Sequence, residues 1–78
     1  MKRTEELLNT VAGALESKVK FCLEQEKNER EMIRIYNEYA HGQKSHPFVE
    51  EVKRHEIRAE VYRDIADVLK RSADIWRA

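Results

Sequence analysis

The chain is interrupted once, at Ala40-His41-Gly42-Gln43-Lys44-Ser45-His46-Pro47. Glycine and proline are the strongest breakers of a helical pattern, and Gly13 is the one residue of either type outside this stretch. Gly42 suits the position just after a helix, and Pro47 suits the first turn of the next one. The sequence therefore predicts two helices joined by a short turn at about residues 41–46.

Upstream of the turn, apolar side chains recur at the spacing of a helical stripe. Thr4 can cap a helix there, and Glu5 and Glu6 follow in the first turn, where the helix dipole favours negative charge. Two neighbouring rows of seven-residue steps form the a/d seam that is typical of coiled coils. These rows are Leu8, Leu15, Cys22, Glu29 and Tyr36, and Ala12, Val19, Glu26, Ile33 and Ala40. A first helix is expected over about residues 4–40.

The second helix, expected over about residues 47–77, carries two apolar lines. Its seam consists of Phe48, His55, Tyr62, Leu69 and Trp76, beside Val52, Ala59, Ala66 and Ala73. The second line, about 100° around the helix, consists of Val61, Ile65, Val68 and Ile75. One partner helix covers only one stripe, so a lone hairpin would leave the second line exposed. The sequence therefore predicts an all-α antiparallel two-helix hairpin, coiled-coil-like, that dimerises into a four-helix bundle through the second line.

Pairing the two helices about the turn gives the expected register. Tyr36 falls near Val52, and Ile33 falls near His55. The first helix is longer than the second, so its first two turns lack a partner within the chain. Exposed apolar residues near the two termini are candidate contacts for a protein partner, and aromatic anchors often dominate such contacts. The candidates are Leu7, Leu8, Val11 and Trp76.

The middle of the first helix, residues 24–31, has no apolar residue, and three interpretations stay open. It can be a solvated stretch braced by pairs such as Glu26 with Arg30. It can also be a buried polar layer that fixes the register of the helices. In the third interpretation, Glu26 and Glu29 form a metal or catalytic site with Glu51 and His55.

The spacing of the candidate ligands speaks against the metal interpretation. Di-iron bundles use Glu-x-x-His on two helices, whereas Glu51 and His55 are separated by one residue more. Zinc proteases use His-Glu-x-x-His, and His55-Glu56-Ile57-Arg58-Ala59 lacks the second histidine. Neither a glycine-rich phosphate loop nor another cofactor motif is present. No metal and no cofactor are therefore expected, and a metal-dependent bundle enzyme stays an alternative hypothesis.

The composition bounds the remaining functions. The chain has 78 residues, enough for a single small domain, with 15 basic and 15 acidic residues and a net charge of zero. A neutral chain has no global field to attract nucleic acid or an anionic membrane. A nucleic-acid-binding regulator is therefore the weaker alternative. It would use the basic residues Arg54, Arg58, Lys70 and Arg71.

Cys22 and the start of the chain indicate a compartment. A single cysteine cannot form an intramolecular disulfide, which favours a reducing environment. Residues 1–10 read as neither a signal peptide nor a spanning helix. No residue motif identifies a family. We therefore expect a cytoplasmic, non-enzymatic protein-interaction module that forms a homodimer and serves as an adaptor, inhibitor or assembly component.

Overall fold

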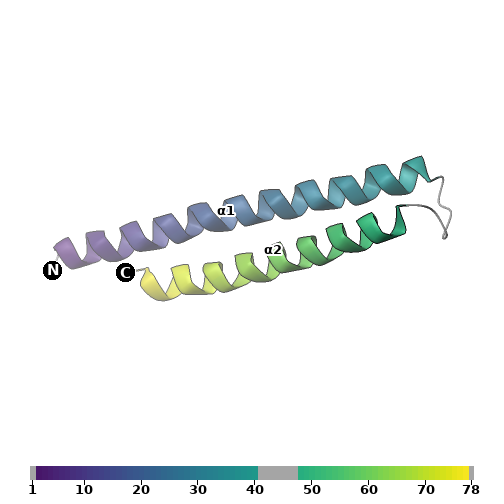
Figure 1. Cartoon of the computed structure of the whole chain (residues 1–78). Coiled ribbons are helices and arrows are strands. Elements are labelled where there is room, and N and C mark those ends of the chain that lie inside the picture. The colour runs from purple at the N-terminus through teal and green to yellow at the C-terminus, as the bar shows by residue number, and fades with distance from the viewer. Residues whose placement is uncertain (1, 41–47, 78) are drawn as a thin grey trace.

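Two long helices, α1 (Lys2–Tyr39) and α2 (Val49–Trp76), make up the molecule as far as the structure describes it. The structure is a computed structural model and describes residues 2–40 and 48–77. The helices lie side by side and antiparallel, with both chain ends at the same end of the molecule (Figure 1). No strand occurs in the described ranges. The predicted all-α antiparallel hairpin is confirmed.

The helix boundaries differ from the predicted ones by about two residues, which is usual for sequence-based boundaries. The first helix begins at Lys2, so Thr4 lies inside the helix and does not cap it. The second helix begins at Val49, with Phe48 in the N-cap position and no side-chain cap hydrogen bond. The predicted roles of Gly42 and Pro47 and the turn itself lie outside the described residues.

An aromatic cluster joins the helices at the end next to the turn. The ring of Phe48 lies 5.0 Å from that of Tyr36 and 5.4 Å from that of Tyr39, measured between centroids. The imidazole of His55 also stacks on Tyr36, with the ring centroids 5.7 Å apart. Aromatic pairs in this distance range are attractive beyond the area they bury. The beginning of α2 is therefore held by the packing of Phe48 on α1 and not by a side-chain cap.

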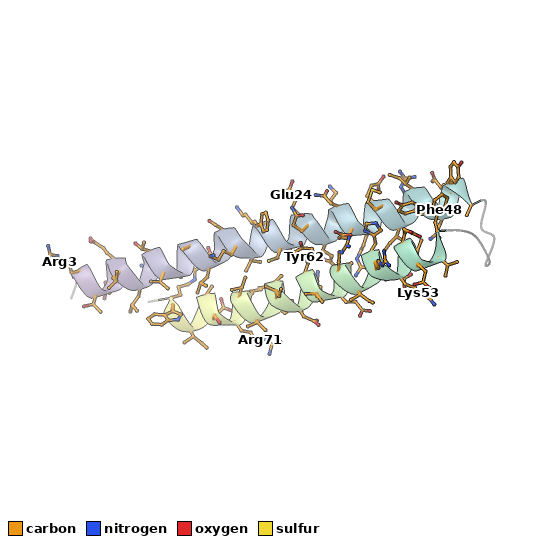
Figure 2. All side chains as sticks on the ribbon, in the orientation of Figure 1. Arg3, Glu24, Phe48, Lys53, Tyr62 and Arg71 are labelled. Carbon is orange, nitrogen blue, oxygen red and sulfur yellow. The ribbon has the colours of Figure 1, made fainter. Side chains whose placement is uncertain are left out.

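A row of small residues on α2 lies against α1. The buried residues of this row are Val52, Ala59, Ala66 and Ala73, and α1 contributes Ala12, Cys22 and Ala40. Small side chains let the helix backbones approach, while the larger seam residues pack beside them. Tyr62, for example, points toward α1, whereas Glu24 and Arg71 point away from the seam (Figure 2). No large side chain among the described residues is fully buried, so the core is thin.

The observed register agrees with the predicted one to within about one turn. His55 contacts both Glu29 and Tyr36, which bracket its predicted neighbour Ile33. Further along, Arg63 of α2 lies 3.6 Å from Glu26 of α1. Antiparallel neighbours keep such a constant offset when a short connection joins the two helices. These contacts set the register of the half of the hairpin next to the turn.

The hairpin is far more extended than a compact monomer of its size. Its Cα radius of gyration is 17.8 Å, against about 11.5 Å expected for 78 residues. Its accessible surface is 6336 Å², against about 5,000 Å² expected for a folded monomer of 9.3 kDa. The hairpin therefore exposes about 1,300 Å² of surface to solvent that a compact fold of this mass would bury.

Gly13 is exposed in the interior of α1, and a Cβ atom built on it would meet nothing within 4 Å. The helix runs straight through this residue, so neither a break nor close packing requires glycine here. Gly13→Ala should stabilise the protein by up to about 1 kcal/mol, because alanine loses less backbone entropy in a helix. Urea unfolding monitored by circular dichroism measures this gain. A loss of stability would show that glycine is needed at this position.

Candidate interaction surface

The second apolar line of α2 is exposed in the hairpin. Val61, Ile65, Val68 and Ile75 are 49%, 42%, 58% and 81% exposed, whereas the alanine row on the same helix is almost completely buried. The structure therefore places the predicted self-association residues on the surface of a single chain. A shallow hollow lies beside two of them, lined by Asp64, Ile65, Val68 and Leu69.

One broad face of the hairpin is charged. Arg77 of α2 forms an ion pair with Glu16 of α1, and Arg63 pairs with Glu26 on the same side of the seam. Between these two pairs, Leu23 and Lys70 line one shallow groove. We call this side the charged face. Its seven-residue rows are Glu16, Leu23 and Arg30 on α1, and Arg63, Lys70 and Arg77 on α2.

The opposite broad face is apolar, and both helices contribute to it. On α2, the row that contains Arg58 and Ile65 flanks the seam on the side away from Arg63, and Arg58 lies 4.0 Å from Glu29 there. On α1, the row that contains Val11 and Tyr39 flanks the seam on that same side. One turn away from Val11 and Tyr39 lie the exposed side chains of Leu7 and Ile35. We call this side the apolar face. Its apolar residues are Leu7, Val11, Phe21, Ile35, Tyr39, Val61, Ile65, Val68 and Ile75, and the same rows also carry the exposed charged side chains of Lys18, Arg54 and Arg58.

Sequence reasoning missed Phe21 and Ile35 as candidate site residues. Phe21 is 60% exposed, the largest side chain in the middle of the apolar face. The signal was present, because Leu7, Phe21 and Ile35 repeat at 14-residue steps and so share one helix face. Asn28 interrupts this row, and the row lies outside the a/d seam of the first helix.

The polar middle of α1 is mostly buried where it meets α2. The side chains of Glu26, Glu29 and His55 are 12%, 16% and 15% exposed. Glu29 accepts a hydrogen bond from Nδ1 of His55, and Glu26 accepts hydrogen bonds of 2.9 and 3.1 Å from the predicted partner Arg30. The pair predicted by the solvated interpretation is thus present, and Glu24, Lys27 and Asn28 are exposed, whereas Glu26 and Glu29 are only partly exposed because they face α2.

The four candidate metal ligands do not come together in the structure. Glu26 faces the guanidinium groups of Arg30 and Arg63, and Glu29 faces His55. One carboxylate oxygen of Glu51 is buried without a hydrogen-bond partner among the described residues. In the described ranges, no group of three His, Cys, Asp or Glu side chains is placed to hold a metal ion. Two of the four candidate ligands are thus paired with arginine or histidine side chains instead of facing a common centre.

The basic candidates for nucleic-acid contact are dispersed. Arg54 and Arg58 lie on one part of α2, and Lys70 and Arg71 lie about 18 Å further along the helix. Other arginines are held by carboxylates of their own helix. Arg34, for example, hydrogen-bonds Glu31 and Glu38, and its hydrogen bonds lower the pKa of the Glu31 carboxyl. The structure does not gather these cations into one patch.

The candidate partner-binding residues lie at the open end of the hairpin, where α1 extends beyond α2 (Figure 1). Leu7 is well exposed there, but Leu8 and Val11 are half-buried, contrary to the expectation that all three are exposed. Trp76 is 47% exposed at the end of α2. Its indole is an aromatic anchor that a partner can still reach.

Comparison with known proteins adds no assignment. No protein-family model matches the chain, and neither the curated proteins nor the solved structures contain a match. Neither described helix is long and apolar enough to cross a membrane. The function of the chain therefore has to follow from its own residues and their geometry.

Proposed function

We propose that the chain is a non-enzymatic protein-interaction module that self-associates as a homodimer of hairpins. One observation carries the proposal: the line Val61, Ile65, Val68 and Ile75 stays exposed in the hairpin although it is apolar. A pair of hairpins buries such a line when they pack as an antiparallel four-helix bundle. Of the four candidate catalytic residues, Glu26 is paired with Arg30, and Glu29 is hydrogen-bonded to His55.

The free energy gained by burying the exposed line on α2 is comparable to the free-energy cost of association. Full burial of a Val or Ile side chain contributes about 1.5–3 kcal/mol, and the four residues of the line are on average a little over half exposed. The eight such residues of a dimer then supply about 7–14 kcal/mol. Association costs about 4–15 kcal/mol in lost freedom of movement. The line supports a dimer, but further contacts are needed for a tight one.

A different protein is proposed to contact the open end of the dimer. Trp76 is the exposed aromatic residue there, and tryptophan is among the residue types that most often dominate interface energy. Leu8 lies half-buried at the same end of the hairpin. Such an arrangement is typical of adaptors and assembly components, in which the scaffold is rigid and one anchor binds the partner.

Co-expression of a tagged and an untagged copy tests both parts of this proposal. The tagged chain should retain the untagged copy, and mass spectrometry should identify further retained proteins. Those proteins should be lost with Trp76→Ala, while the untagged copy stays bound. Retention of neither an untagged copy nor another protein would contradict the proposal.

A further inference from the structure

We propose that the second copy binds the whole apolar face in reversed orientation, with Phe21 at the centre of the contact. The two-fold axis crosses the hairpin at the height of Phe21, so α1 packs along the partner's α1 and α2 along the partner's α2. This inference rests on the proposed self-association and deepens it. The self-association surface then includes α1, on which the sequence had indicated candidate contacts for a different protein but no self-association residue.

The residue pattern along α1 favours the reversed orientation. The apolar face is apolar at one end of α1, with Leu7 and Val11, and again at the other end, with Ile35 and Tyr39. Phe21 lies midway between these ends. A second copy turned end for end brings each apolar end of α1 against the opposite apolar end of the partner's α1.

A second two-fold arrangement, in which each α1 packs along the partner's α2, covers the apolar face less completely. If each α1 packed along the partner's α2 instead, the two helices would run side by side at equal height. Arg77, just beyond the end of α2, pairs with Glu16 of α1, so α2 does not reach the first turns of α1. Leu7 would then face no helix and would stay exposed in the dimer. The reversed orientation covers it.

A single two-fold axis can pass through the middle of both apolar rows. The middle of the row on α1 and the middle of the line on α2 lie at similar heights along the hairpin. Phe21 lies halfway between Glu16 and Glu26 on α1. The α2 partners of these two glutamates, Arg77 and Arg63, bracket Val68. Val68 is in turn the middle of the line from Val61 to Ile75. A reversed copy therefore places Phe21 against Phe21 and the Ile65–Val68 region against itself.

The available area fits a second copy. The hairpin is 61 Å long, and it exposes about 1,300 Å² more than a compact monomer, whereas a standard interface buries about 800 Å² per partner. The chain has no net charge, so two copies do not repel each other as whole molecules. The charged face is already occupied by the pairs of Glu16 with Arg77 and of Glu26 with Arg63. The apolar face is thus the surface that a second copy covers.

Phe21→Glu and its matched control Leu23→Glu test the face. Both change an exposed apolar side chain of α1 to glutamate, but Leu23 lies on the charged face. Phe21→Glu should raise the dimer dissociation constant by on the order of 100-fold or more in sedimentation velocity, because each dimer would bury two carboxylates. Leu23→Glu should leave the dissociation constant within about threefold of the wild-type value.

Disulfide cross-linking tests the orientation. In a Cys22→Ala background, oxidised Phe21→Cys protein should form a covalent dimer, and Leu23→Cys should stay monomeric on a denaturing gel. A Phe21→Glu protein that dimerises like the wild type, or a Phe21→Cys protein that does not cross-link, overturns the inference while the proposed self-association stands. A wild-type protein that is monomeric throughout overturns both.

Discussion

Val68→Glu is expected to convert the dimer into a monomer. Val68 lies in the middle of the exposed line on α2 and is 58% exposed in the single hairpin, so the hairpin itself can accept a glutamate there. In the proposed dimer, two carboxylates would be desolvated and close to each other. Burial of an unpaired charge costs several kcal/mol, which is comparable to the whole energy that the α2 line supplies.

Light scattering with a matched variant measures this loss. Lys70→Gln changes the net charge by the same amount but lies on the charged face, so it should leave the dimer intact. The monomeric Val68→Glu protein should also melt at a lower temperature, because the thin core of a lone hairpin then lacks the stabilisation by its partner. If Val68→Glu and Lys70→Gln have the same mass in solution, the α2 line is not at an interface.

Glu29→Ala is expected to destabilise the protein by about 1–3 kcal/mol, because it leaves a buried donor without its acceptor. Nδ1 of His55 donates to Glu29, and both side chains are about 15% exposed. Glu24→Ala is the control, since Glu24 is exposed on the same helix and points away from α2 (Figure 2). The control should change the stability by no more than about 0.5 kcal/mol.

The double variant Glu29→Leu with His55→Leu distinguishes two causes of destabilisation, an unsatisfied hydrogen-bond donor and the loss of side-chain contacts. Replacement of both partners by apolar groups leaves nothing unsatisfied, so this protein should be at least as stable as the wild type. Urea unfolding of the three variants gives the free energies. Equal effects of Glu29→Ala and Glu24→Ala would show that the layer contributes nothing specific.

The seams and the register of the hairpin were predictable because they follow from spacing. Residues such as Leu15 and Ala66 repeat at seven-residue steps, and a short turn allows only one antiparallel pairing of the two rows. The helix boundaries were less predictable, since Phe48 begins α2 through its packing on Tyr36. Such a contact between distant residues leaves no local capping signal.

The α1 half of the apolar face and the pairing of the polar middle were not predictable from the sequence in the same way. Phe21 lies outside the seam, and only the cross-helix contacts place its row on the same broad face as Ile65. Glu29 fits a solvated, a buried or a metal-binding environment equally well by spacing. Its environment follows from the position of His55 on the other helix.

Sedimentation equilibrium of the unmodified chain over a wide range of concentration tests self-association most directly. We expect a single species of twice the 9.3 kDa chain mass at high micromolar concentration, with dissociation on dilution. A chain that stays at 9.3 kDa at those concentrations, and that is well folded by circular dichroism, would contradict it.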